Sequence, residues 1–267
     1  MGEARTALQM VTMGFDEAPF LDELRTTGAE EAASEYVQEK QYAFEWALDF
    51  IQKHVNGEFN EGAAIFMTGP MRSGKTLLCQ AIGEQLFKEG LVESITRVST
   101  LVDTRSIGEI KSRSGCVSYP CQVIENSDVD TLCEDPGVLL LEEIQFWDPK
   151  ILAKIVRART RSGRITVLSG LDLDYTGKPW RSADAIAELI IQLTDQLGIA
   201  HLHSICDTCH QSGAELTQLK VPDEDGNLVL APSNLFGGPV VPEAADLKFM
   251  PQCDKHHQIG SPIDVDL

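Results

Sequence analysis

The alternation of apolar runs and amphipathic segments along the chain predicts an α/β protein. Short, mostly apolar runs predict strands at residues 63–67, 94–98, 121–124, 137–141 and 165–168. Apolar residues that recur at helical spacing predict helices at residues 30–55, 77–86, 149–159 and 185–197. Strands that alternate with helices in this way are typical of a parallel sheet with helices on both faces. We therefore expect such a sheet to form the main domain.

Changes in this pattern divide the chain into three parts. Residues 1–60 comprise an acidic, weakly ordered arm followed by the helix at 30–55. Residues 61–200 form the α/β domain, in which the polar stretch 103–115 predicts a mobile loop. Residues 201–267 contain short β-like pieces with Cys, Gly and Pro, which predict a second, small module. We expect the first helix to pack on the outside of the α/β domain; a role in binding a partner is the alternative.

The segment after the first predicted strand has the pattern G-x-x-x-x-G-K-T. It comprises Gly69, Pro70, Met71, Arg72, Ser73, Gly74, Lys75 and Thr76. Between a strand and a helix, this pattern lets backbone N–H groups surround phosphate, while the helix directs its positive end to the same place. Lys75 can then reach the β- and γ-phosphates of ATP, and the Thr76 hydroxyl can hold Mg²⁺. The alternative is a glycine-rich turn that binds nothing.

Two carboxylates follow the most apolar of the predicted strands. Residues 139–141 are all leucine and lead into Glu142 and Glu143, at the strand edge where open α/β sheets bind ligands. A carboxylate there commonly orders Mg²⁺, and the next residue is placed to act on the nucleophile. If both residues lie on extended backbone, their side chains point to opposite sides and serve different partners. A solvated acidic turn is the alternative.

Two pairs of metal-ligand residues lie in the C-terminal part. Cys206-x-x-Cys209 and Cys253-x-x-His256 have the spacing of zinc knuckles and can converge into a closed tetrahedral site. Four protein ligands leave no open position, so the metal would be structural. His210 and His257 are adjacent alternatives for the fourth ligand, and a coincidence of cysteines with a surface histidine is the other alternative.

The composition indicates which partners and which cellular compartment to expect. The chain has 267 residues, 43% of them hydrophobic, and a formal net charge of −19, which argues against the basic surface of a duplex-binding protein. We find neither an apolar stretch long enough to cross a bilayer nor a basic, apolar start typical of a signal peptide. Seven cysteines, an odd number, do not resemble a secreted disulfide framework. We expect a soluble cytoplasmic protein without nucleic-acid or membrane partners.

Taken together, the motifs resemble those of the type II thymidine kinases, the zinc-bearing family of deoxynucleoside kinases. The loop at 69–76 is similar to that family's phosphate loop, including its Pro-Met pair. Glu142 and Glu143 stand where the family has D-E, in D-E-x-Q-F. The segments that match in order are 69–76, 103–105, 112–115, 142–146, 170–180 and 237–238, and the two Cys/His pairs on either side of the last segment also match. The resemblance covers most of the chain and implies a P-loop NTPase-like sheet with a C-terminal zinc module that carries a lasso-like loop.

The resemblance implies a role for each matching residue. Glu143 would be the general base for the nucleoside 5′-hydroxyl, and Glu142, Asp103 and Arg105 would join the 69–76 loop in managing the phosphates and Mg²⁺. The nucleoside would be bound by Gln145, Phe146, Leu171, Tyr175, Phe236, Gly237, Gly238 and Phe249. Tyr175 replaces the family's Phe and would stack on the base, so its hydroxyl needs a partner if it is buried.

The implied activity is that of an ATP-dependent thymidine kinase that forms thymidine monophosphate in nucleoside salvage. Its cofactors would be ATP, Mg²⁺ and a structural Zn²⁺, and the chain would assemble as a homo-oligomer, a tetramer of closed symmetry. Glu142 and Arg72 depart from the family pattern. These departures leave open an alternative, a catalytically weak nucleotide-binding or regulatory protein on the same scaffold.

Overall fold

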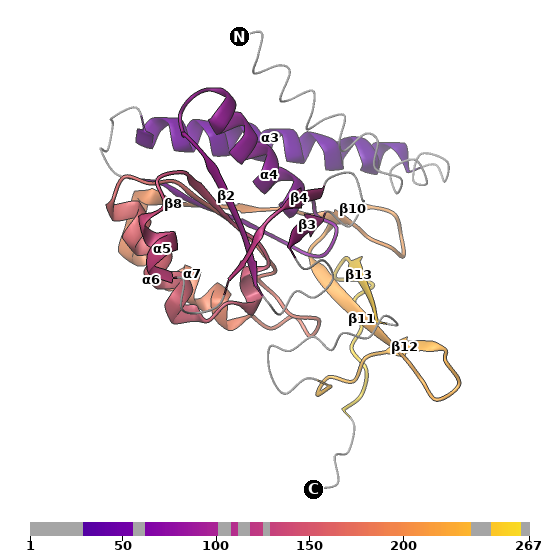
Figure 1. Cartoon of the computed structure of the whole chain (residues 1–267). Helices are drawn as coiled ribbons and strands as arrows, with labels where there is room; N and C mark the ends of the chain where they lie inside the picture. The colour runs from indigo at the N-terminus through magenta and orange to yellow at the C-terminus, as the bar shows by residue number, and fades with distance from the viewer. Residues whose placement is uncertain are drawn as a thin grey trace, which may run out of the picture.

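A computed structural model describes residues 29–55, 62–100, 108–111, 118–124, 129–235 and 247–262 (Figure 1). The helices are α3 (Glu30–Val55), α4 (Lys75–Lys88), α5 (Val129–Glu134), η3 (Ile144–Phe146), α6 (Pro149–Arg161), α7 (Arg181–Leu193) and η4 (Thr194–Gln196). The first strands are β1 (Ala64–Thr68), β2 (Ile95–Thr100), β3 (Glu109–Lys111), β4 (Ser118–Pro120), β5 (Gln122–Ile124), β6 (Val138–Leu141), β7 (Thr166–Ser169) and β8 (Leu197–His201). The C-terminal strands are β9 (Ser204–Ile205), β10 (Ser212–Ala214), β11 (Leu216–Pro222), β12 (Leu228–Leu230) and β13 (Lys248–Gln252).

A six-stranded sheet of order β5-β2-β6-β7-β1-β8 forms the centre of the molecule. Each neighbouring pair in it is parallel. Helices α3 and α4 cover one face, and α5, α6 and α7 cover the other (Figure 1). The predicted fold class, a parallel α/β sheet flanked by helices, is therefore confirmed.

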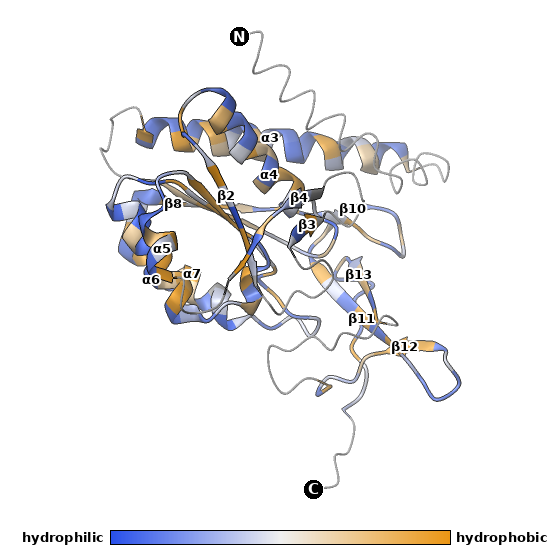
Figure 2. Ribbon diagram, in the orientation of Figure 1, coloured by the Kyte–Doolittle hydropathy of each residue, from blue (hydrophilic) through white to orange (hydrophobic). Residues whose placement is uncertain are grey.

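Successive residues of the central strands supply two separate cores. In β1, Ile65 and Met67 pack toward α3 and α4, while Ala64 and Phe66 pack toward α6 and α7 because side chains alternate along a strand. These strands are buried on both faces, and Figure 2 shows that they are mainly hydrophobic. This explains why the sequence shows continuous apolar runs there.

Helix α3 begins and ends at the residues that the sequence predicted. It lies beside α4 on the outside of the sheet (Figure 1), which confirms the expected packing. The ring of its buried His54 contacts the carbonyl oxygen of Asp195, with Nε2 and O 2.8 Å apart. Near its middle, Trp46 lies so close to Gly198 of β8 that an added Cβ would meet the indole at 2.7 Å.

The predicted helix at 185–197 was wrong at both ends. Helix α7 begins at Arg181 and ends at Leu193, so each end lies four residues before the predicted one. Leu197 begins strand β8, which the sequence analysis missed. Leu193 and Leu197 pack into the same core cluster, so their helical spacing reflects burial on one face and not a continuous helix. Short α5 was also missed, and part of the predicted loop at 103–115 forms strand β3, which pairs with β4.

The C-terminal part contains two small antiparallel sheets. Strand β11 pairs with both β12 and β13, and β9 pairs with β10 to form a hairpin. An isolated bridge joins Pro232 to Gly260. The predicted division of the chain near residues 60 and 200 stays a prediction. In the described part of the chain, none of the helices combines the length and hydropathy that crossing a bilayer requires.

Candidate active site

The phosphate loop connects β1 to α4 and depends on its two glycines. Gly69 has φ +134°, and a Cβ at this position would lie 2.0 Å from the Leu202 carbonyl oxygen. Gly74 has φ +86° and directly precedes α4. Both are conformations that residues other than glycine adopt at a cost. The sequence pattern therefore places the N-terminus of α4, the positive end of its helix dipole, against the loop, as a phosphate site requires.

The Lys75 ammonium group lies inside the curve of this loop. Its Nζ donates hydrogen bonds to the carbonyl oxygens of Gly69 and Pro70, at 2.9 and 2.6 Å, and to Ser73 Oγ at 3.1 Å. Ser73 is fully buried. One positive charge is thus held at the centre of the loop.

Glu142 is buried directly behind Thr76. Its carboxylate accepts hydrogen bonds from Thr76 Oγ1 and Gln80 Nε2, both at 3.1 Å, and from the Ser169 hydroxyl. Burial raises the pKa of this carboxyl, and the hydrogen bonds oppose that rise in part. The structure thus joins the phosphate loop, α4 and the ends of β6 and β7 through one carboxylate.

Glu143 has a different backbone from the one assumed for it in the sequence analysis. Its φ and ψ are 52° and 48°, in the left-handed region, so the assumption that both glutamates lie on extended backbone was wrong. With this conformation Glu143 directly precedes η3, two residues after the end of β6. Glu143 is half-buried, and its carboxylate accepts a hydrogen bond from Gln145 Nε2.

Gln145 connects the glutamate to the next loop. Its other amide atom, Oε1, accepts the Leu171 N–H at 3.0 Å, and the side chain is buried. Gly170 permits this contact, since a Cβ there would lie 2.7 Å from that oxygen. The position and amide orientation of Gln145 are therefore fixed between Glu143 and the loop at 171–180.

The loop at 171–180 is closed by hydrogen bonds across its base. Asp174 Oδ1 accepts the backbone N–H groups of Thr176 and Lys178, and a bridge joins Leu173 to Pro179. The Tyr175 hydroxyl donates to the Pro232 carbonyl oxygen at 2.7 Å. The sequence analysis required a partner for this hydroxyl, and the structure supplies it from the segment that leads to residue 236.

The predicted nucleoside residues fall into three groups. Gln145, Leu171 and Tyr175 are linked through the loop at 171–180, as described above. Phe146 makes an edge-on contact with Trp180, and Phe249 pairs with Leu219 in the sheet of β11 and β13. The remaining predictions, on Asp103, Arg105, Phe236, Gly237 and Gly238, lie outside the described residues, as does the arm before residue 29.

Three thiols and one imidazole converge between the β9–β10 hairpin and the end of β13. The donor atoms of Cys206, Cys209, Cys253 and His256 all lie within 4.8 Å of one another. His256 Nδ1 is 3.6 Å from Cys206 Sγ and 3.2 Å from Cys253 Sγ, and the Cys209 and Cys253 sulfurs are 4.0 Å apart. Tetrahedral zinc bound at about 2.3 Å from sulfur spaces its donors about 3.8 Å apart. The cluster could therefore hold zinc, with His256 as the fourth ligand.

The surroundings of Cys206 favour its thiolate, the form that binds metal. Burial acts to raise the pKa of the thiol, but backbone N–H groups of residues 208, 209 and 253 and the His256 ring lower it to about 6. His257, one of the two alternative ligands, instead contacts the Tyr175 carbonyl oxygen through Nε2 at 3.0 Å. His210 is exposed at the hairpin tip.

Comparison with known proteins decides the family. A family model described as thymidine kinase matches residues 62–234. The chain belongs to the thymidine kinase family. The matched region contains the phosphate loop, both glutamates, the loop at 171–180 and the first two metal-ligand cysteines, whereas α3 and the second Cys/His pair lie outside it.

Curated members of the thymidine kinase family are distant relatives. The thymidine kinase of Ureaplasma urealyticum serovar 10 is 30% identical over 158 residues, which are 57% of this chain and 65% of the relative. The chain thus spans about two thirds of the length of that relative. The thymidine kinase of Coprothermobacter proteolyticus is 25% identical over 195 residues, which are 72% of this chain and 89% of that relative's length.

The likeness to one solved structure, which is typical of several that match, is weak. A DNA replication initiation factor aligns with 61% of this chain and 44% of its own at a TM-score of 0.37 and 16% identity. The fold assignment therefore comes from the strand order and the parallel pairing of the chain's own sheet.

Several contacts in this member of the thymidine kinase family come from residues that the motif analysis missed. Thr217 Oγ1 accepts the Met71 N–H of the phosphate loop at 3.0 Å. Gln80 and Ser169 bind Glu142, and both were open to prediction. Gln80 lies four residues after Thr76, on the same helix face, and Ser169 ends a strand at the same sheet edge as Glu142. Thr217 gave no such signal.

Proposed function

We propose that this chain transfers the γ-phosphate of ATP to the 5′-hydroxyl of thymidine and forms thymidine monophosphate for nucleoside salvage. The observation that carries this proposal is the hydrogen bond between Thr76 and Glu142, which couples the phosphate loop to a carboxylate in a chain of the thymidine kinase family. That pairing is the arrangement in which a P-loop enzyme holds Mg²⁺ near the transferring phosphate.

The phosphate end of the proposed site uses the loop and its neighbours. Backbone N–H groups of residues 69–76 and the Lys75 ammonium would bind the phosphates. Thr76 would hold Mg²⁺, and Glu142, which is buried and bonded to the Thr76 hydroxyl, would act on the ion through a bound water. Asp103 and Arg105 are proposed to assist here. When bound, Mg²⁺ would neutralise charge that develops on the phosphate oxygens.

The nucleoside end is proposed to lie around Glu143 and the loop at 171–180. Glu143 would accept the proton of the 5′-hydroxyl, and Gln145 would hold this carboxylate in place. Tyr175 would stack on thymine, with its hydroxyl bound to the Pro232 carbonyl oxygen. Residues 236–238 follow Pro232 closely and would bind the edge of the base, and Phe146, Leu171 and Phe249 would complete the site.

A second candidate is a regulatory nucleotide-binding protein with weak catalysis. It is favoured by the environment of Glu142, whose buried carboxyl has a raised pKa and is already bound by three side chains. Such a protein would bind ATP and turn over slowly. Intact Lys75, Thr76 and Glu143 support the enzyme instead.

The test of this proposal is a nucleoside panel. Purified chain with ATP and Mg²⁺ is incubated with thymidine, deoxycytidine, deoxyadenosine and deoxyguanosine, and ADP release is followed by a coupled assay. We expect phosphorylation of thymidine to be strongly favoured. Equal, marginal rates with all four nucleosides, together with tight ATP binding, would support the regulatory candidate.

The metal cluster gives a prediction of its own. We expect about one zinc per chain in protein purified under reducing conditions, held in a closed structural site by the three cysteines and His256. Cys209→Ser should remove most of the zinc and lower the melting temperature, because the metal ties the hairpin to β13. Cys121→Ser, outside the cluster, is the matched control. Metal analysis that finds no zinc in the unmodified chain would refute the site.

A further inference from the structure

Helix α3 lies outside the region that matches the family, yet it reaches the phosphate loop. The hydroxyl of Tyr36, a buried residue on this helix, donates a hydrogen bond to the Arg72 carbonyl oxygen at 2.9 Å. Arg72 is in the middle of the loop and has φ +61°. A residue with a side chain adopts this left-handed conformation only at an energetic cost. External contacts must therefore help to hold the loop in its curve.

Two further elements hold the same short stretch of the loop. Ser204 Oγ, on β9, donates to the same Arg72 carbonyl oxygen at 3.2 Å. The Arg72 guanidinium forms an ion pair with Asp207, which lies between the first two cysteines of the metal cluster. The adjacent Met71 N–H is bound by Thr217. Contacts from α3, the hairpin and β11 thus converge on residues 71 and 72.

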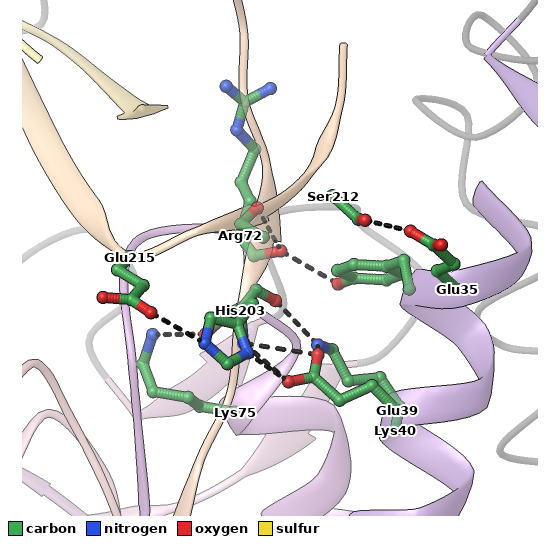
Figure 3. A network of polar contacts seen from close by, with 11 residues as sticks. Glu35, Glu39, Lys40, Arg72, Lys75, His203, Ser212 and Glu215 are labelled. Atoms are coloured by element: carbon green, nitrogen blue, oxygen red, sulfur yellow. Dashed lines mark hydrogen bonds and ion pairs between the residues drawn. The ribbon is translucent and has the colours of Figure 1, made fainter. Parts of the chain in front are cut away.

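Tyr36 is itself fixed by a polar network that joins the next turn of the helix to the segment before β9 (Figure 3). Lys40 is fully buried, lies 4.3 Å from the centre of the Tyr36 ring and donates to the His203 carbonyl oxygen at 2.7 Å. It also pairs with Glu39, whose carboxylate binds the His203 ring and N–H. Burial lowers the pKa of Lys40 to about 8. Since His203 directly precedes Ser204, both hydroxyl donors to Arg72 belong to one connected unit.

We propose that Tyr36 is a positioning residue for the phosphate loop, through which helix α3 holds the Arg72 peptide in the curve that ATP requires. This inference rests on the proposed function for the role of the loop. Tyr36 does not touch the substrates; it acts through the Arg72 carbonyl. Helix α3 thus contributes to the nucleotide site, although it lies outside the region that matches the family.

The test compares Tyr36→Phe with Tyr42→Phe, a matched change on the same helix at a residue that is 72% exposed. Tyr36→Phe keeps the buried ring and removes only the hydroxyl. We expect ATP affinity, measured by calorimetry with Mg²⁺, to fall roughly 2- to 10-fold, the range for one neutral hydrogen bond. The KM for thymidine should stay within about twofold, and Tyr42→Phe should change neither. Ser204→Ala removes the other donor to the same carbonyl and should reproduce the effect.

A second readout does not depend on the proposed function. Hydrogen exchange of the peptide that spans residues 69–76, measured without nucleotide, should be faster in Tyr36→Phe than in the unmodified chain and unchanged in Tyr42→Phe. Exchange at the wild-type rate would overturn the inference. So would a lower melting temperature with equal losses of ATP and thymidine binding, which would assign Tyr36 a structural role. If the unmodified chain binds no ATP, the proposed function fails. The exchange comparison still tests whether the Tyr36 hydroxyl holds the loop in place.

Discussion

Replacing Lys75 by Ala is expected to lower turnover by about two to three orders of magnitude, the scale of losing one preorganised charged donor at a transferring group. The Lys75 ammonium lies within the curve of the phosphate loop and binds two of its carbonyl oxygens. In the proposed reaction it turns to the β- and γ-phosphates, where its contact strengthens as negative charge develops. The variant loses this stabilisation and also the charge that offsets the carbonyl dipoles of the loop.

The matched control for this change is Lys154→Ala. Lys154 is on α6, pairs with Asp130 at the surface and is more than half exposed, so its loss should leave kcat unchanged. The measurement is the steady-state rate of thymidine phosphorylation at saturating ATP and Mg²⁺. Wild-type turnover in Lys75→Ala would remove the basis for placing phosphates in this loop.

Glu143→Gln is the second change with a large expected effect. A positioned carboxylate base typically contributes about 10²–10⁴-fold, and phosphoryl transfer has a loose transition state in which positioning carries much of the effect. We therefore expect kcat to fall by about 10²–10³-fold. Glutamine can still accept the hydrogen bond from Gln145, so the surroundings should persist and ATP affinity should stay close to that of the unmodified chain.

The neighbouring variant separates the two carboxylates. Glu142→Gln should raise the Mg²⁺ concentration that is required for half-maximal rate, because Glu142 faces Thr76. The control is Glu188→Gln on the exposed side of α7. If Glu143→Gln kept most of its turnover while Glu142→Gln abolished it at saturating Mg²⁺, the two proposed roles would have to be exchanged.

The sequence predicted the features that depend on local physics. The bounds of α3 and the strand before the phosphate loop follow from short-range spacing. The spacing within Cys206-x-x-Cys209 and within Cys253-x-x-His256 marked both pairs as metal ligands, and their meeting at one site was inferred from zinc chemistry. The backbone at Glu143 did not follow from such spacing: β6 ends at Leu141, as predicted, but the short-range pattern gave no sign of the left-handed turn at Glu143 before η3. Strand β8 was hidden since Leu197 lies at helical spacing from Leu193.

Contacts between distant segments that no motif marks were beyond prediction from one sequence. Nothing in the local pattern connects Tyr36 or Thr217 with a loop far away along the chain. The same holds for His257, which the sequence offered as a metal ligand and the structure places against the Tyr175 backbone. The residues that belong to a motif could be predicted from the sequence. The side chains from other elements that hold those residues in place could be identified only in the structure.

The central claim is tested most directly by identifying the product of the reaction. The chain is incubated with thymidine, Mg²⁺ and ATP that carries ¹⁸O in its γ-phosphate, and the products are analysed by mass spectrometry. The account predicts thymidine 5′-monophosphate that carries the labelled phosphoryl oxygens, formed in equal amount to ADP. Release of labelled inorganic phosphate and ADP, with thymidine recovered unchanged, would contradict it.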